Sequence, residues 1–230
     1  DLSAELRQHE ATGARGTIAL AAVEDTASYG VVPTKENGEV EAFLEKQPGP
    51  APTNRINAGT YVLDRSVVDA IPAGRAVSIE VEVFPGLVGN ALHGYMAEGY
   101  WIDIGTPERY LESTYDLLAG KVESTLPPRD ETDSLVYDGS ITSGARIGPL
   151  SVIGRHCSVG DRAVVERAVL HDSVIVGAEA NIEASVLAEG VRVEDGARVE
   201  PGALLGAGAS VAAGAVVRGD ARVAPGERVE

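Results

Sequence analysis

The sequence has little cysteine, few cations and no long apolar run, and each shortage excludes a class of protein. Cys157 is the only cysteine among 230 residues, which excludes an internal disulfide and a cysteine-based zinc cluster and fits a reducing cytoplasm. Lys and Arg number 19 against 35 Asp and Glu, so the formal charge of -16 leaves no broad basic surface for nucleic acid or an anionic membrane. A small phosphorylated ligand needs only one or two cations and stays compatible with this charge.

The longest uncharged run, Ala203 to Val217, is dense in Gly and Ala and shorter than a membrane-spanning helix requires. We therefore expect no transmembrane helix. The sequence starts at Asp1 instead of methionine and shows no signal peptide, which indicates a fragment of a longer protein. Its length favours two domains.

Internal repetition is the strongest feature of the second half. Large aliphatic residues recur at intervals of six, with two single-residue slips. Four positions after each comes a second residue that is mostly small and is often preceded by Gly. A helix places apolar residues three and four apart, and a strand places them two apart, so a period of six indicates a coil with flat sides and tight corners. The aliphatic positions are Ile141, Ile147, Ile153, Val159, Val165, Leu170, Val176, Ile182, Leu187, Val193, Val199, Leu205, Val211, Val217, Val223 and Val229.

This pattern resembles the hexapeptide-repeat family of left-handed parallel β-helices, whose coils have three sides of six residues. The handedness is implied by the resemblance. The repeats predict about five coils in a prism roughly 25 Å long, and each slip is interpreted as a corner with one residue deleted. We expect the β-helix to serve as an oligomerisation surface, so that the protein is a homo-oligomer.

The first half alternates predicted strands and helices, which is typical of an α/β domain. The turn signal Asn37-Gly38 predicts a hairpin, and Thr106-Pro107 predicts the start of a helix. Strands are expected at 17–23, 29–32, 40–44, 58–63, 92–96 and 100–104, and helices at 1–10, 65–71, 78–88 and 107–120. The polar segment 121–135, which contains a Pro-Pro pair, is the predicted linker between an α/β domain at 1–120 and the β-helix domain at 136–230.

Five segments of the first half resemble, in order, motifs of the sugar-1-phosphate nucleotidyltransferases, most closely the mannose-1-phosphate guanylyltransferase type. That family has a Rossmann-like α/β fold, of which these residues would form the C-terminal part. The fifth motif, Ser78 to Pro85, is similar to the guanylyltransferase branch in particular. The other four are Tyr29-Gly30-Val31-Val32, Phe43-Leu44-Glu45-Lys46, Asn57-Ala58-Gly59-Thr60-Tyr61 and Tyr100 to Pro107.

The resemblance implies transfer of a nucleotidyl group from a nucleoside triphosphate to a sugar 1-phosphate, with release of pyrophosphate. Such chemistry needs Mg²⁺ and cations because the barrier is mostly charge. Asp103 is the implied ligand of Mg²⁺, a hard cation that prefers oxygen. Glu45 is expected to accept hydrogen bonds from sugar hydroxyls, and Lys46 to neutralise the sugar phosphate. In the family a proline usually follows this lysine, whereas Gln47 stands here.

Three further residues are implied to line the sugar pocket: Gly30, Asn57 and Gly59. Ordinary turn chemistry is the alternative interpretation of each. Glu80 and Glu82 are left out of the predicted site, because a carboxylate is favoured in the first turn of a helix without any ligand.

The family holds its nucleotide with a Gly-rich loop that contains an arginine, and nothing in Asp1 to Val23 resembles that loop. Gly13 to Gly16 is too short and lies between a helix and a strand, the reverse of the order that binds phosphate. We therefore expect the 230 residues alone to be inactive. The choice of GTP and of mannose 1-phosphate depends on the Ser78 segment alone.

Two other functions remain open. Many hexapeptide β-helices are acyltransferases that use a histidine at a corner, but His156 and His171 occupy different phases of the repeat and no inserted loop would hold an acyl donor. Both histidines are expected to be solvated, and Cys157 occupies the small inward position of its repeat. The second alternative is a non-catalytic regulatory subunit, against which the presence of Asp103 and Lys46 argues.

Overall fold

The computed structural model describes residues 1–44, 51–89, 91–127, 129–142 and 144–230. They form two compact units, Asp1–Trp101 and Ile102–Glu230, and each unit is described by itself. No helix in the described ranges is long and apolar enough to cross a membrane.

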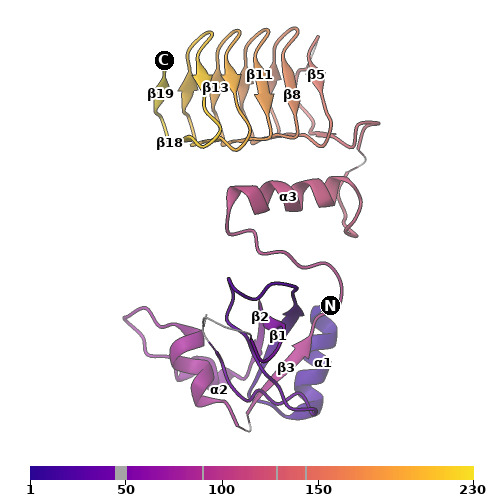
Figure 1. Ribbon diagram of the computed structural model, residues 1–230, viewed down its shortest axis with the longest axis vertical. Coiled ribbons are helices and arrows are strands. Elements are labelled where there is room, and N and C mark those ends of the chain that lie inside the picture. The colour runs from indigo at the N-terminus through magenta and orange to yellow at the C-terminus, as the bar shows by residue number, and fades with distance from the viewer. Residues whose placement is uncertain (45–50, 90, 128, 143) are drawn as a thin grey trace. The chain divides into compact units, whose positions relative to one another are not determined.

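Helix α1 (Leu2–Thr12) opens the first unit and ends two residues beyond the predicted range of 1–10. The Asp1 carboxylate accepts hydrogen bonds from two first-turn amides, and Gly13 ends the helix with a left-handed φ of 62°. The helix lies beside the sheet (Figure 1), and it buries Glu5 and His9, which are 1% and 8% exposed. Its buried face is therefore unusually polar.

Strands β1 (Gly16–Ala22), β2 (Arg55–Leu63) and β3 (Leu92–Met96) form a sheet of order β2-β1-β3. β1 runs antiparallel to β2 and parallel to β3. The sequence predicted all three strands, with bounds correct to within three residues. The apolar core of this unit contains Ile18, Leu20, Val32, Val40, Val67, Phe84, Leu87 and Leu92.

The segment between β1 and β2 turns back at Asn37-Gly38, as predicted, with Gly38 at a φ of 87°. Its two arms pair through single antiparallel bridges, Val31 with Leu44 and Thr34 with Val40, instead of forming the two regular strands that were expected. Further bridges join one arm to β2 and the other to β3. This hairpin is therefore held between the two outer strands of the sheet.

After β2 the chain forms the short helix α2 (Arg65–Asp69) and two short helical turns. Ser78 caps the first turn as predicted, since its Oγ accepts a hydrogen bond from the Val81 amide at 3.2 Å. The single helix predicted to continue to about Val88 is wrong, because the turns are the π-helical η1 (Ile79–Val83) and the 3₁₀-helical η2 (Phe84–Gly86). Pro85 has no backbone N–H and cannot continue an α-helical ladder.

The second unit begins with an extended segment and helix α3 (Pro107–Leu118), which Thr106 caps. The helix begins at Pro107, which confirms the start predicted from Thr106-Pro107. The strand predicted at 100–104 is wrong, because those residues form no strand in the structure.

The remainder of this unit is a parallel β-helix whose coils stack side by side (Figure 1). Its strands are two or three residues long and form three parallel sheets, as the resemblance to hexapeptide-repeat β-helices implied. The strands are β4 (Leu135–Val136), β5 (Arg146–Ile147), β6 (Val152–Ile153), β7 (Ser158–Val159), β8 (Val164–Glu166), β9 (Val169–Leu170), β10 (Ile175–Val176), β11 (Asn181–Glu183), β12 (Val186–Leu187), β13 (Arg192–Val193), β14 (Arg198–Val199), β15 (Leu204–Leu205), β16 (Ser210–Val211), β17 (Val216–Val217), β18 (Arg222–Val223) and β19 (Arg228–Val229).

The inward positions of the repeat form ladders that run from coil to coil. Val159, Val176, Val193 and Val211 are in register on one sheet, and each is at most 2% exposed. Both slips fall at the same corner of successive coils, between β8 and β9 and between β11 and β12. The residues at these shortened corners, Arg167 and Ala184, have positive φ values of 52° and 39°. The predicted deletions at corners are thereby confirmed.

The repeat begins differently from the prediction. Ile141 was expected to point inward, but it is 65% exposed. It bridges to Ser158, an outward position, instead of Val159, and a shift of one residue moves a side chain to the other face of a sheet. The first strand of the β-helix is β4, ahead of this position.

One outer face of the β-helix is apolar and is covered by α3. Leu111 of the helix is buried with Val169 and Val186 of two successive coils. Tyr110, Tyr115, Val152 and Leu204 surround this contact. The compact units therefore divide before α3, whereas the sequence placed a domain boundary after it at residue 120; the domain bounds stay a prediction.

Candidate functional site

Among the described residues of the predicted site, Asn57 makes the most side-chain hydrogen bonds. Its Oδ1 accepts a hydrogen bond from the Gly59 amide at 2.9 Å, and its Nδ2 donates to Tyr61 Oη at 2.8 Å and to Glu80 Oε1 at 2.6 Å. The carboxamide is therefore held from both ends, which fixes the direction in which it points.

The conformation of β2 explains how these groups meet. Ile18 of β1 pairs with Tyr61 while Leu20 pairs with Asn57, so three residues of β2 lie opposite one residue of β1. This bulge requires the positive φ of 82° at Gly59, and a side chain there would meet open space. The bulge brings the Asn57 and Tyr61 side chains together, four residues apart along the chain.

The hairpin places Gly30 beside Asn57. Val31 bridges antiparallel to Ile56, and the Val32 amide donates to the Arg55 carbonyl at 2.9 Å. One step further in this register sets Gly30 opposite Asn57. The structure thus brings Gly30, Asn57 and Gly59 to one region of the sheet.

Trp101, which belongs to the Tyr100 to Pro107 motif, packs against this region. The Tyr29 and Trp101 rings pack edge to face with centroids 5.7 Å apart, and Trp101 Nε1 donates to the Ala58 carbonyl at 3.2 Å. Residues of four motifs therefore meet in one apolar cluster around Ile56, to which Tyr29, Leu44, Ala58 and Trp101 belong.

Glu45 and Lys46 lie outside the described residues, so their predicted roles stay predictions. The last described residue before them is Leu44, which exchanges backbone hydrogen bonds with Val31 at 2.9 and 3.0 Å.

Asp103 belongs to the second unit and is exposed. Its Oδ1 accepts a hydrogen bond from the Gly105 amide at 3.0 Å, which leads the chain into the Thr106 cap of α3. Within the described residues, no three His, Cys, Asp or Glu side chains are grouped so as to hold a metal. A lone exposed carboxylate is compatible with Mg²⁺, which is commonly bound by one or two carboxylates together with substrate phosphates and water.

Glu80 is the residue that the sequence analysis left out and the structure joins to the site, through its 2.6 Å bond from Asn57. Burial, reinforced by the Glu80 charge, raises the pKa of the Tyr61 phenol, against the hydrogen bond from Asn57, which lowers it. Tyr61 therefore stays protonated at neutral pH. In the sequence, Glu80 stands two residues after the Ser78 cap. Its carboxylate was explained there by the helix dipole, so its contact with Asn57 was not predicted.

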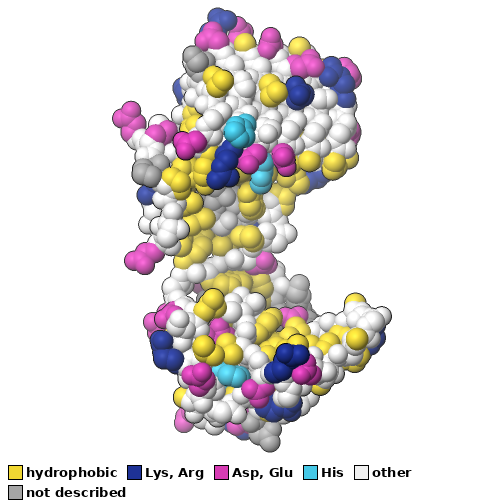
Figure 2. All heavy atoms as spheres, turned by 180° about the vertical axis from the view of Figure 1, so that it is seen from behind, with side chains coloured by type: hydrophobic (Ala, Val, Ile, Leu, Met, Phe, Trp, Pro, Cys, Tyr) yellow, Lys and Arg dark blue, Asp and Glu magenta, His cyan; other side chains and the backbone are white. Residues whose placement is uncertain are grey.

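In the β-helix, His156 and His171 are exposed, and histidine side chains are visible on the surface of this unit (Figure 2). Cys157 is 1% exposed, its Sγ lies 3.1 Å from the His171 carbonyl oxygen, and burial raises the pKa of its thiol. A buried thiol with a raised pKa is a poor nucleophile. The expected roles of all three as corner and core residues agree with these positions.

Comparison with known proteins supports a nucleotidyl transferase region followed by a β-helix. The family model described as "Nucleotidyl transferase" matches residues 1–120, and the model "EIF2B subunit epsilon LbH domain" matches residues 131–217. A mannose-1-phosphate guanylyltransferase of Mycobacterium tuberculosis is 41% identical over 187 residues, which cover 80% of this chain and 52% of that protein. A mannose-1-phosphate guanyltransferase of Schizosaccharomyces pombe is 40% identical over 152 residues, or 65% of this chain and 40% of that protein.

The chain spans about half the length of these relatives, or less. The "Nucleotidyl transferase" match alone takes in more than half of the chain and contains the Asn57 region and Asp103. The second match, over residues 131–217, covers most of the stacked coils. The chain therefore belongs to the nucleotidyl transferase family and carries a β-helix domain behind the nucleotidyl transferase region.

Proposed function

We propose that this chain supplies the sugar-phosphate-binding part of an enzyme that joins a nucleoside monophosphate unit to a sugar 1-phosphate. A phosphate oxygen of the sugar 1-phosphate attacks the α-phosphorus of the nucleoside triphosphate, the bond to the β-phosphate breaks, and pyrophosphate leaves. The observation that carries this proposal is the Asn57 carboxamide, held between Gly59, Tyr61 and Glu80. A fixed amide beside two glycines is suited to a ligand rich in hydroxyl groups.

Each residue has a role in this proposal. Gly30 and Gly59 let the sugar approach the backbone, and Asn57 orients its hydroxyls. Glu45 accepts hydrogen bonds from the sugar, and Lys46 neutralises its phosphate. The acid Glu80 acts as a positioning residue, because it fixes the Asn57 amide.

Asp103 is proposed as a ligand of Mg²⁺, which when bound would neutralise charge on the reacting phosphates. The Asp103 turn holds one carboxylate oxygen toward the Gly105 amide. The residue therefore has a defined orientation before any metal binds.

The proposed sugar is mannose 1-phosphate and the proposed nucleotide is GTP. The Ser78 to Pro85 segment and the names of the two relatives support this choice. We also propose that the protein acts in the cytoplasm, forms a homo-oligomer through the β-helix, and that the 230 residues alone bind sugar phosphate without turning it over.

Two measurements test the proposal. The 230-residue chain is titrated with mannose 1-phosphate, glucose 1-phosphate and free mannose, and we expect saturable binding of a sugar 1-phosphate that Asn57→Ala weakens. The gene product that carries this sequence is then assayed for pyrophosphate release with four nucleoside triphosphates, and GTP with mannose 1-phosphate should be the fastest pair. Binding without any turnover in that protein would support a regulatory subunit instead.

A further inference from the structure

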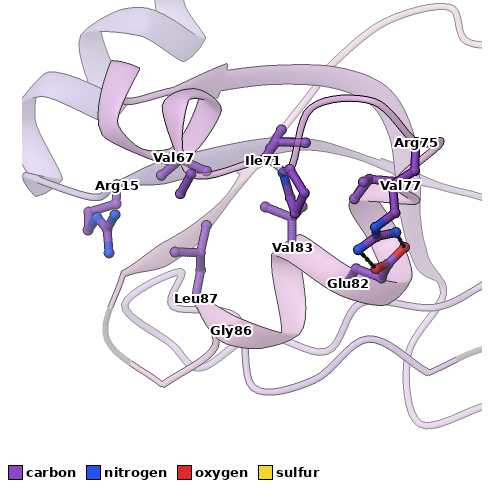
Figure 3. Close-up of a pocket in the computed structure, with 11 residues that line it drawn as sticks. Arg15, Val67, Ile71, Arg75, Val77, Glu82, Val83, Gly86 and Leu87 are labelled. Atoms are coloured by element: carbon purple, nitrogen blue, oxygen red, sulfur yellow. Dashed lines mark hydrogen bonds and ion pairs between the residues drawn. The ribbon is translucent and has the colours of Figure 1, made fainter.

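A pocket of about 310 Å³ lies in the first unit between α2, the turns η1 and η2, and the start of β1 (Figure 3). None of the residues of the proposed sugar site lines it. Its middle is apolar, and Figure 3 shows the side chains of Val67, Ile71, Val83 and Leu87 between two arginines at opposite ends. The volume lies at the lower end of the range for small-molecule sites, about 300 to 1,000 Å³.

The charge at the Arg75 end is already balanced. Arg75 Nη2 lies 2.6 Å from Glu82 Oε2, and Arg75 Nη1 lies 3.2 Å from Glu82 Oε1. The Ser78 amide also donates to Glu82 Oε1, at 3.3 Å. This end is thus a neutral, structurally fixed ion pair.

The charge at the Arg15 end is not balanced by an acid. Arg15 Nη2 donates a long hydrogen bond to Ser66 Oγ at 3.4 Å, and among the described residues no carboxylate lies within ion-pair distance of the guanidinium. The Arg15 backbone is anchored on both sides, since its amide donates to the Ala91 carbonyl and its carbonyl accepts from the Asp64 amide, each at 2.9 Å. The apolar pocket therefore carries one net positive charge at its Arg15 end.

We propose that this pocket binds a small amphipathic monoanion, a short aliphatic or aromatic carboxylate. Its carboxylate lies on the Arg15 guanidinium, whose planar donors match two carboxylate oxygens. Its apolar body lies on Val67, Ile71 and Leu87, where it removes apolar surface from water. This binding does not depend on the proposed nucleotidyl transfer.

The test is an NMR titration of the 230-residue chain with octanoate and with octylammonium, which share an apolar tail and differ in charge. Octanoate should bind saturably and about fivefold or more tightly than octylammonium, a difference of about 1 kcal/mol. Arg15→Gln should remove this preference, because it removes the positive charge. The Arg15 side chain is exposed, so the fold should be unchanged. Arg65→Gln, a neighbouring exposed arginine paired with Asp69 outside the pocket, should leave octanoate binding unchanged.

A second variant blocks the pocket without altering its charge. Gly86 lines the pocket, and no atom lies within 4 Å of a Cβ built there, so Gly86→Leu adds a large side chain at the pocket wall without a clash at its Cβ. This variant should abolish octanoate binding with an unchanged circular dichroism spectrum and melting temperature. Equal binding of the two probes, or unchanged octanoate binding in Arg15→Gln and Gly86→Leu, would overturn the proposal.

Discussion

Glu108 Oε1 of α3 lies 3.3 Å from Arg222 Nη2 of the β-helix strand β18. Arg222 occupies the outward ladder position that Val169, Val186 and Leu204 occupy in the preceding coils. The ladder is apolar where the body of α3 covers it and becomes charged where the first turn of the helix presents a carboxylate. The residue types along this outer face therefore match the part of α3 that lies on each coil.

The apolar part of this contact should dominate its stability. Leu111→Ala removes a side chain that is 6% exposed, so it should lower the free energy of unfolding of the second unit by about 2 to 4 kcal/mol. Glu108→Gln breaks an exposed, solvent-screened ion pair and should lower the free energy of unfolding far less. Denaturant unfolding of both variants measures the difference; equal losses would mean that α3 is not packed on the coils as described.

The stacking of the coils leaves no room at certain glycines. A Cβ at Gly177 would lie 2.4 Å from Asp195 Oδ1 and 2.6 Å from the Asp195 amide nitrogen, in the next coil. Gly177→Ala should therefore cost about 1 to 3 kcal/mol through overpacking. Gly86→Ala, where the added methyl meets open space, serves as the control and should be nearly neutral. A neutral Gly177→Ala in thermal unfolding would contradict the coil spacing.

Helix α1 buries a carboxyl group whose Oε1 has no hydrogen-bond partner among the described atoms. Burial is the main cause that raises the pKa of Glu5 above its ordinary 4.5, and it outweighs the N-terminal charge and a backbone hydrogen bond at Ala19 that lower it. Below pH 4.5 the Glu5 carboxyl is largely neutral in both the folded and the unfolded chain, so its burial does not lower the free energy of unfolding through charge. As pH rises through the raised pKa of the folded state, the buried charge destabilises the fold.

Glu5→Gln should remove that dependence. The variant keeps an acceptor for the backbone amide, so at pH 4 its melting temperature should match that of the parent chain, and at pH 7 it should be a few degrees higher. Glu10→Gln, on the exposed face of the same helix, is the matched control. A parent chain whose stability rises from pH 5 to 7 relative to Glu5→Gln would show that the carboxylate is stabilised after all.

The β-helix was predictable because each coil repeats the same local requirement, an aliphatic residue inward and a small residue at the corner. Val165, Ile182 and Leu187 are all fully buried as the period predicted. The docking of α3 was missed, although the outward residues Val169 and Val186 carried a signal: two-faced apolar strands need a cover. The inward period alone does not show which outer face is covered.

The candidate site was predictable only in part, for a different reason. Asn57 and Gly59 were identified by motif, but their geometry depends on the β2 bulge, which arises from pairing with β1 and has no separate sequence signature. Glu80 reaches Asn57 from 23 residues further along the chain. Contacts of that kind follow from tertiary packing and are invisible to local patterns.

Substitutions at Glu80 test whether this residue positions Asn57 for the sugar 1-phosphate or only stabilises the fold. In the full gene product, Glu80→Ala should raise the KM for the sugar 1-phosphate about tenfold with kcat little changed, because the Asn57 amide loses one of its fixed partners. Glu80→Gln keeps an acceptor for Asn57 and should restore the KM. Glu82→Ala, in the same turn but paired with Arg75, is the control and should leave the KM unchanged. A fall in kcat at constant KM would contradict a positioning role.

Asp103 is the residue on which the proposed metal chemistry depends. Asp103→Asn retains the Oδ1 acceptor for the Gly105 amide, so the turn before α3 and the melting temperature should be preserved. Mg²⁺-dependent pyrophosphate release by the full gene product should fall roughly 100-fold or more, because several kcal/mol of charge stabilisation would be lost. Glu108→Gln, an exposed carboxylate five residues away, controls for the change in net charge. If Asp103→Asn keeps near-normal turnover and the same dependence on Mg²⁺ concentration, the metal is held elsewhere and Asp103 serves only to shape the turn.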